Sequence, residues 1–122
     1  MPLRCLLVDD SEAFLEAASL LLEREGLAVM GVASSIAGAL RQARALRPEV
    51  ILADIGLGGE SGFDLARLLA QDGPGGGTEV ILISAGAEAD YAELIAESPA
   101  AGFLAKSELS ARGISRILGH TA

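Results

Sequence analysis

The sequence predicts a single α/β domain, residues 1–122, built on a doubly wound, five-stranded parallel sheet with strand order 2-1-3-4-5. Two observations predict it. Short apolar runs of strand length alternate five times with segments of helical periodicity. The chain also shows no internal repeat and no boundary that would divide it. Five such units joined by right-handed crossovers commonly adopt the order 2-1-3-4-5, so helices should cover both faces of the sheet.

Five strands are expected, at residues 3–8, 27–33, 50–55, 79–84 and 101–105. The third is the most distinctive, because residues 50–53 form an unbroken apolar run that meets a single acid, Asp54. Such runs are typical of strands buried on both faces of a parallel sheet. The residues that follow, 56–62, are rich in glycine and are expected to form a loop.

Serine caps and helix-stopping residues mark the first two helices. Ser11 is expected to cap the first helix, which Gly26 ends in the C′ position. Ser34 or Ser35 is expected to cap the second, which Pro48 cannot continue. The side chains expected to face the core from these two helices are Phe14, Ala18, Leu21, Leu22, Ile36, Leu40 and Ala43.

Three further helices are expected, over residues 63–72, over residues 87–98, and after a cap at Ser107. Pro99 stops the fourth helix. Gly113 lies inside the last helix, where glycine costs about 1 kcal/mol relative to alanine. The expected core-facing side chains are Leu65, Leu68, Leu69, Tyr91, Leu94, Ile95, Ile114, Ile117 and Leu118.

Composition and charge exclude several classes of function. The formal net charge of −8 repels nucleic acid phosphates, so we expect no nucleic acid contact by this chain. No apolar run approaches the length of a membrane span, and the N-terminus lacks a signal-peptide pattern, so no membrane contact is expected. A single cysteine excludes an internal disulfide and fits a reducing compartment, which favours the cytoplasm.

Residues with related chemistry stand at the carboxyl ends of four expected strands: Asp9 and Asp10, Asp54, Ser84, and Lys106. In a parallel sheet these ends meet at one edge, where ligands bind in open α/β folds. The three acids together form a hard-oxygen pocket suited to Mg²⁺. Asp54 can act as a nucleophile that forms an aspartyl-phosphate, with Lys106 supplying positive charge and Ser84 a hydrogen bond.

With these residues at this spacing, the chain resembles the receiver domain of two-component response regulators over essentially its whole length. The segment Gly102-Phe103-Leu104-Ala105-Lys106 matches the family at the fifth strand. The resemblance implies a flavodoxin-like (βα)₅ fold, close to that of chemotaxis regulators. It also implies a phosphorelay function in which the chain catalyses its own phosphorylation and dephosphorylation and is not otherwise an enzyme.

The resemblance implies a role for each site residue. Asp54 is the phosphorylated residue. Asp9 and Asp10 hold Mg²⁺, with Asp10 and Asp54 as direct ligands and the backbone carbonyl of Gly56 as a third. Lys106 contacts the phosphoryl group. Ser84 is the switch hydroxyl and Phe103 the switch aromatic, and together they reshape the surface of the fourth and fifth units.

Three departures from the family pattern stand out. Gly58 replaces a proline that the family often has four residues after the acceptor, which predicts a looser loop. Ser107 replaces a proline after the lysine, which leaves the conformation of that peptide bond open. Gly56 and Gly86 lack side chains at two positions that line the site, so neither can orient or block an attacking water.

The expected partners are a histidine kinase or a histidine phosphotransfer protein, with a homodimer on phosphorylation left open. Two architectures remain, a stand-alone receiver that shuttles phosphate and the N-terminal part of a DNA-binding transcriptional regulator. A small Mg²⁺-dependent phosphatase with an aspartyl nucleophile is disfavoured, because Asp9 and Asp10 are adjacent rather than two apart and the chain is short. A flavin or nucleotide module is disfavoured because acids stand where a phosphate-binding loop is needed.

Several other features carry no expected function. Residues 73–77 form a glycine-rich linker at the opposite edge of the sheet and lack the lysine of a P-loop. Cys5 is expected to be a small core residue, and His120 to belong to a frayed tail. The solvated face of the second helix is expected to carry Arg41, Arg44 and Arg47.

Overall fold

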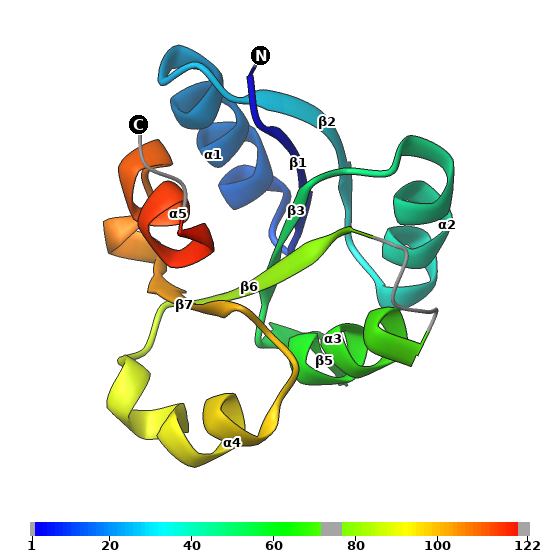
Figure 1. The fold of residues 1–122 in the computed structure, drawn as a ribbon, viewed down its shortest axis with the longest axis vertical. Helices are drawn as coiled ribbons and strands as arrows, with labels where there is room; N and C mark the ends of the chain where they lie inside the picture. Colours follow the sequence, from blue (N-terminus) through cyan, green and yellow to red (C-terminus); the bar gives the residue numbers. More distant parts are fainter. Residues whose placement is uncertain (1, 72–76, 120–122) are drawn as a thin grey trace.

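The fold is described from a computed structural model for residues 2–71 and 77–119. Its main sheet is parallel and five-stranded, in the order β2-β1-β3-β6-β7, so the predicted strand order is confirmed (Figure 1). Asp72, most of the linker at residues 73–77 and His120 lie outside the described residues. The strands are β1 (Arg4–Val8), β2 (Ala28–Ala33), β3 (Val50–Asp54), β6 (Glu79–Ser84) and β7 (Gly102–Ala105).

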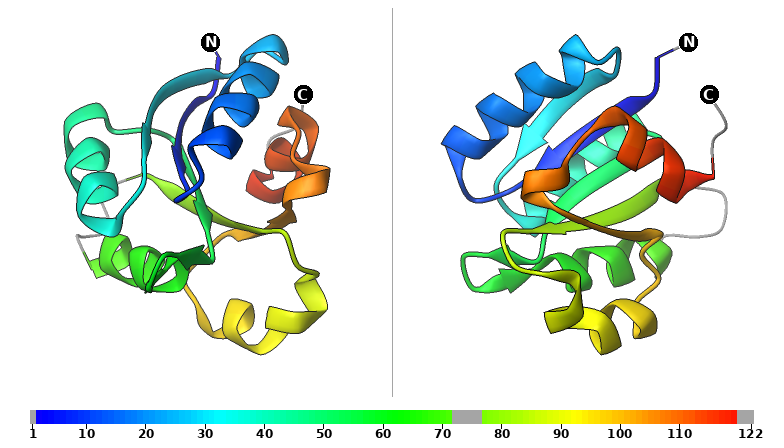
Figure 2. Two further views of the ribbon diagram at one scale, coloured as in Figure 1. Left: turned by 180° about the vertical axis from the view of Figure 1, so that it is seen from behind. Right: turned by 90° about the vertical axis from the view of Figure 1, so that its left-hand side faces the viewer.

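Helices cover both faces of the sheet, α1 and α5 on one and α2, α3 and α4 on the other (Figures 1 and 2). The α-helices are α1 (Glu12–Arg24), α2 (Ile36–Leu46), α3 (Gly62–Gln71), α4 (Ala92–Glu97) and α5 (Ala111–Leu118). Two short 3₁₀ turns, η1 (Glu88–Tyr91) and η2 (Lys106–Glu108), precede α4 and α5.

The alternation of side chains along each strand divides the core into two clusters. Along β3, Val50 and Leu52 pack toward α1 and α5, whereas Ile51 and Ala53 pack toward α2 and α3. All four are fully buried, as expected of a central parallel strand with helices on both faces. The end of β3 is therefore held by packing on both faces, and this fixes the position of Asp54, the residue that follows Ala53.

Serine caps begin the first two long helices where the sequence predicts. Ser11 Oγ accepts a hydrogen bond from the Phe14 backbone N–H, and Ser35, rather than Ser34, caps α2. Gly26 follows α1 with a φ of +95°, a conformation that glycine adopts without steric cost.

The predicted cap of the last helix is wrong. Ser107 lies inside η2, and α5 begins at Ala111, where the N-cap Ser110 accepts a hydrogen bond at its Oγ from the Gly113 backbone N–H. The physical reason is the intervening Leu109, which is buried against the α1 side of the core and needs the extra turn to reach it.

Three leucines predicted to face the core are exposed instead: Leu21, Leu68 and Leu94. On α1 the buried face is formed by Leu15, Ala18 and Leu22. The sequence predicted Ala18 and Leu22 to face the core, but not Leu15. Leu94 is 53% exposed because α4 is only one and a half turns long and its neighbour Ile95 takes the core position.

The expected loop at residues 56–62 contains a small antiparallel hairpin, β4 (Gly56–Leu57) and β5 (Glu60–Ser61). The two turn residues, Gly58 and Gly59, have φ values of +54° and +97°. Positive φ at both central residues is the requirement of a type I′ hairpin turn, which glycine meets and proline cannot. Gly58 therefore allows the chain to form this turn. The hairpin also places Leu57 in the core, where its side chain is buried.

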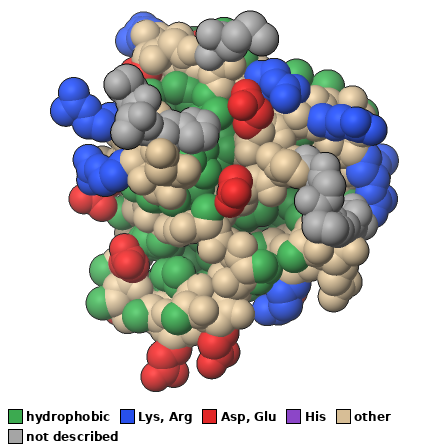
Figure 3. Space-filling view, viewed as in Figure 1, with side chains coloured by type: hydrophobic (Ala, Val, Ile, Leu, Met, Phe, Trp, Pro, Cys, Tyr) green, Lys and Arg blue, Asp and Glu red, His purple; other side chains and the backbone are tan. Residues whose placement is uncertain are grey.

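Charge is unevenly distributed over the surface. Figure 3 shows basic side chains beside α2 and on the opposite side near α1 and α5, and acidic side chains at the end of the molecule that carries α4. The predicted exposure of Arg41, Arg44 and Arg47 is confirmed.

Among the described helices, none is long and apolar enough to cross a membrane.

Cys5 should resist thiol reagents in the folded protein. Its side chain is fully buried, and burial, with a smaller contribution from the charge of Glu23, raises the pKa of the Cys5 thiol to about 12. Because the thiolate is the reactive form, we expect labelling at pH 8 to be at least about 100-fold slower in native buffer than in denaturant. Rapid labelling of the native chain would contradict this burial.

The same shift has a consequence for stability at high pH. The thiol ionises near pH 9.0 in an unfolded chain and near 12 in the fold. Its contribution to stability is therefore fully present below pH 9 and is lost as the pH rises toward 12.

Candidate functional site

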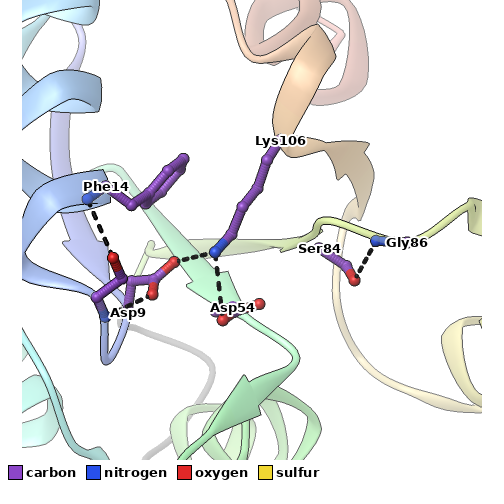
Figure 4. A network of polar contacts seen from close by, with 7 residues as sticks. Asp9, Phe14, Asp54, Ser84, Gly86 and Lys106 are labelled. Atoms are coloured by element: carbon purple, nitrogen blue, oxygen red, sulfur yellow. Dashed lines mark hydrogen bonds and ion pairs between the residues drawn. The ribbon is translucent and has the colours of Figure 1, made fainter.

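The pairing of the strands brings the predicted site residues to one edge of the sheet. Val8 pairs with Ala53, so the next residues along β1 and β3, Asp9 and Asp54, come side by side. The strands β6 and β7 are paired up to their last residues, and Lys106 follows β7 directly. Four strand ends therefore meet around one point, which Figure 4 shows at close range.

Lys106 reaches across this edge to two acids. Its Nζ lies 2.6 Å from Asp9 Oδ2 and 3.5 Å from Asp54 Oδ2 (Figure 4). The same ammonium lies 4.3 Å from the centre of the Phe14 ring. The structure thus brings together Asp9, Asp54 and Lys106, as predicted. No pattern in the sequence indicated that Phe14 would lie beside the lysine.

Asp9 is the most deeply held of the acids. Its side chain is completely buried, and Oδ1 accepts a hydrogen bond of 2.8 Å from the Ser11 backbone N–H. Its Oδ2 has the ion pair with Lys106 but accepts no hydrogen bond of normal geometry from the described residues. A buried carboxylate oxygen in this state has capacity to bind a cation.

The carboxylates fit a divalent cation. Asp9, Asp10 and Asp54 each offer one oxygen, and these oxygens all lie within 4.8 Å of one another. Oxygen donors from a few carboxylates, with room for water or phosphate oxygens, are what Mg²⁺ prefers. Asp10 is exposed and faces the hairpin, since a Cβ at Gly58 would lie 3.4 Å from its Oδ2.

Burial and the neighbouring charges shift the pKa of Asp54 and of Lys106 at this edge. Burial raises the pKa of Asp54, the charge of Asp9 raises it further, and Lys106 with a backbone hydrogen bond from Gly56 opposes this. Burial alone would lower the pKa of Lys106, but its contact with Asp9 and the charge of Asp54 raise it above its usual value. The site therefore keeps a protonated lysine and retains negative charge that a second cation could neutralise.

Ser84 lies at the edge, and among the described residues its Oγ is not hydrogen-bonded to Asp54. Its buried Oγ accepts a hydrogen bond of 3.0 Å from the Gly86 backbone N–H (Figure 4). Tyr91 lies beside Ser84. The sequence predicted Tyr91 only as a core-facing residue of the fourth helix. A Cβ at Gly86 would lie 3.4 Å from Tyr91 Cε2 and 3.6 Å from its hydroxyl oxygen. The tyrosine thus borders the space that Gly86 leaves.

Phe103 is already buried in this structure, with 8% of its surface exposed. Its ring lies against that of Tyr91, with the ring centres 6.4 Å apart. The outward position from which it was expected to turn is not the one observed. The peptide bond between Lys106 and Ser107, left open by the sequence, is trans, as are all the peptide bonds among the described residues.

Comparison with known proteins gives a consistent picture. The model of the response regulator receiver domain matches residues 5–117. The DNA-binding response regulator MtrA of Mycolicibacterium smegmatis is 33% identical over 120 residues, which cover 93% of this chain and 50% of that protein. The response regulator GacA of Pseudomonas viridiflava is 30% identical over 105 residues, covering 85% and 48%. The chain spans about half the length of the curated relatives it matches.

Solved structures agree on the fold. The signal receiver domain of NarL from Mycobacterium tuberculosis superposes with a TM-score of 0.81 at 28% identity, over 98% of both chains. The chemotaxis response regulator CheY4 of Vibrio cholerae superposes with a TM-score of 0.82 over 96% of this chain and 99% of that one. At 21% identity the second likeness concerns the fold alone.

Proposed function

The chain belongs to the receiver domain family of two-component response regulators. We propose that it accepts a phosphoryl group on Asp54, and that phosphorylation changes the conformation of its surface around α4 and β7. The observation that carries the proposal is the meeting of Asp54 with Asp9 and Lys106 at the carboxyl edge of the sheet. A nucleophilic carboxylate, further acids for a cation and a fixed ammonium are the groups that phosphoryl transfer to an aspartate needs.

In the proposed step, an Asp54 carboxylate oxygen attacks the phosphorus of a phosphohistidine on a kinase or phosphotransfer protein. The phosphorus–nitrogen bond breaks, its electron pair leaves with the imidazole, and an acyl phosphate forms on Asp54. Lys106, held 3.5 Å from Asp54 Oδ2, neutralises negative charge on the incoming phosphoryl oxygens. Asp54 is nearly buried, so only a small part of the residue is open to solvent.

We assign the cation site to Asp10 and Asp54 with the backbone carbonyl of Gly56, and Asp9 beside them. Mg²⁺ bound there would supply positive charge to the phosphoryl oxygens. The protein's own part is to gather the acids at the ends of β1 and β3, which the pairing of Val8 with Ala53 brings side by side.

We further propose that the phosphoryl group draws Ser84 away from the Gly86 N–H. Phe103 and Tyr91, whose rings pack against each other, would then rearrange and alter the surface of α4 and β7. Coupling energies of about 1–3 kcal/mol are typical of such switches, so the populations shift without complete conversion.

The relatives named as DNA-binding and transcriptional regulators support a role in the control of transcription. In this proposal the chain supplies the phosphorylation step, and the acidic surface of residues 79–105, which contains no Lys or Arg, makes no direct contact with DNA. The donor is expected to be a cytoplasmic histidine kinase or phosphotransfer protein, and a homodimer that forms on phosphorylation is one route to output.

The proposal is tested by incubating the chain with Mg²⁺ and acetyl phosphate and measuring its intact mass. We expect wild type to gain one phosphoryl group that hydroxylamine removes, because acyl phosphates react with it and serine phosphates do not. Asp54→Ala should gain none, whereas Asp90→Ala, which removes an exposed aspartate outside the site, should behave as wild type.

Two results would contradict the proposal: no gain of mass in wild type, or an equal gain of mass in Asp54→Ala. The switch is judged on the same samples by backbone amide NMR shifts. We expect phosphorylation to move the signals of residues 84–106 in wild type and to move them much less in Ser84→Ala. Equal movement in both proteins would remove Ser84 from the switch.

A further inference from the structure

Phe14 holds a place in the site that neither the sequence pattern nor the proposed function accounts for. It lies in the first turn of α1, with its ring face 4.3 Å from Lys106 Nζ (Figure 4). Its backbone N–H donates to Ser11 Oγ at 3.2 Å, and the Ser11 N–H donates to Asp9 Oδ1 at 2.8 Å. The ring is therefore anchored to the same acid that pairs with the lysine.

Three groups hold the ammonium of Lys106: the carboxylates of Asp9 and Asp54 and the ring of Phe14. They differ in how they respond to the proposed reaction. Asp9 and Asp54 belong to the acid cluster that fits a cation, and Asp54 becomes the acyl phosphate, so both change their charge or their partners. The ring of Phe14 takes part in neither event, and its attraction for a cation comes from its own quadrupole.

We propose that Phe14 is a positioning residue for phosphoryl transfer, which keeps the Lys106 ammonium above Asp54 through a cation–π contact while the carboxylates exchange partners. This inference rests on the proposed function. Lysine has a long, flexible side chain, and a fixed ammonium costs conformational freedom that a third contact helps to offset. Phe14 does not touch the reacting atoms and acts only through Lys106.

The plain alternative is that Phe14 is only a core residue, since it also packs against the cluster beneath α1. An apolar side chain of similar size would then serve as well. The two ideas separate on the electronic character of the side chain: Leu fills space without a π face, Tyr keeps the face, and 3,4,5-trifluorophenylalanine keeps the shape but cancels the negative face.

The first measurement is the rate of phosphorylation by acetyl phosphate, followed against donor concentration in saturating Mg²⁺. We expect Phe14→Leu and site-specific trifluorophenylalanine to lower the maximal rate about fivefold, with little change in the donor concentration at half-maximal rate. Phe14→Tyr should stay within about twofold of wild type. A lost ammonium position is expected to slow the chemical step, whereas loosened packing would act on stability instead.

The second measurement needs neither metal nor phosphoryl donor. Lys106 is the only lysine in the sequence, so ¹³C-lysine labelling gives one side-chain signal set. In wild type and Phe14→Tyr, the ring current should shift the Lys106 Hε protons upfield, and in Phe14→Leu this shift should disappear. Trifluorophenylalanine serves as the variant that retains the fold if leucine does not.

The outcomes are distinct. An unshifted Lys106 Hε signal in the metal-free wild type would overturn the inference, as would wild-type phosphorylation rates in both Phe14→Leu and the trifluoro variant. Equal slowing by leucine and tyrosine would also overturn it. A wild type that takes up no phosphoryl group at all would instead count against the proposed function, and the Lys106 signal would still report whether Phe14 positions the lysine.

Discussion

Lys106→Met should slow phosphorylation of Asp54 by about 100-fold, the usual effect of removing one charged group that stabilises a transition state. The ammonium is the cation observed against Asp9 and Asp54, and methionine keeps most of the side-chain volume while removing the charge. The rate is measured by intact mass after timed exposure to acetyl phosphate.

The same variant should bind Mg²⁺ more tightly than wild type does, because a competing positive charge has left the acid cluster. Without metal, Asp9 is left buried and unpaired, which costs about 3 kcal/mol of stability. Saturating Mg²⁺ should therefore raise the melting temperature of Lys106→Met by more than it raises that of wild type.

Arg67→Met is the matched control, since Arg67 pairs with Asp64 on the exposed side of α3, away from the site. It should phosphorylate at the wild-type rate and change stability by less than about 1 kcal/mol. If Lys106→Met were phosphorylated as fast as this control, the lysine would have no part in the transfer. A smaller response to Mg²⁺ than in wild type would contradict the competition between the two cations.

Gly62→Ala should destabilise the fold by about 3 kcal/mol, at the upper end of what overpacking costs. Gly62 is buried at the start of α3, and a Cβ there would collide with the backbone carbonyl oxygen of Asp54 and lie 3.2 Å from Leu82 Cδ2. Since backbone cannot rotate away as a side chain can, α3 or the end of β3 has to move. The expected result is a melting temperature lower by about 10 °C.

Gly56→Ala is the control for this prediction, because a Cβ at Gly56 meets nothing within 4 Å and the substitution lies in the same segment. It should leave the melting temperature nearly unchanged. Because the collision involves Asp54 itself, Gly62→Ala should also slow phosphorylation at temperatures where the variant is fully folded. A fully stable Gly62→Ala would show that the β3–α3 junction tolerates a shift that the observed contacts do not allow.

The strands and the site edge were predictable because they depend on local patterns. Residues 50–53 form an apolar run typical of a central strand, and once the strand order is set, Asp54 must end beside Asp9. The expected strands lie within one or two residues of those observed, and β6 is found with the predicted bounds. The cap at Ser11 also follows from neighbours in the chain, whereas for α2 the neighbours leave Ser34 and Ser35 open and the structure has Ser35.

The errors arise where contacts between distant segments decide. Ser107 has the chemistry of a cap, but the burial of Leu109 moves the start of α5 to Ser110. Leu94 has the periodicity of a core residue, but the shortness of α4 leaves it in solvent. The hairpin at residues 56–61 could have been recognised from its adjacent glycines, since Gly-Gly between short segments is a signal for a tight turn.

The sequence by itself determined the alternation of strands and helices and the residues at the carboxyl ends of the strands, because apolar periodicity is a property of the chain; the order of the strands followed from the topology that such units commonly adopt. Only the tertiary structure decided which side chains complete the site. Phe14 and Tyr91 are aromatic residues in helical patterns, and nothing in those patterns tells that one lies over Lys106 and the other beside Ser84 and Gly86. Such contacts depend on how helices settle on the sheet, which is set by packing across the whole core.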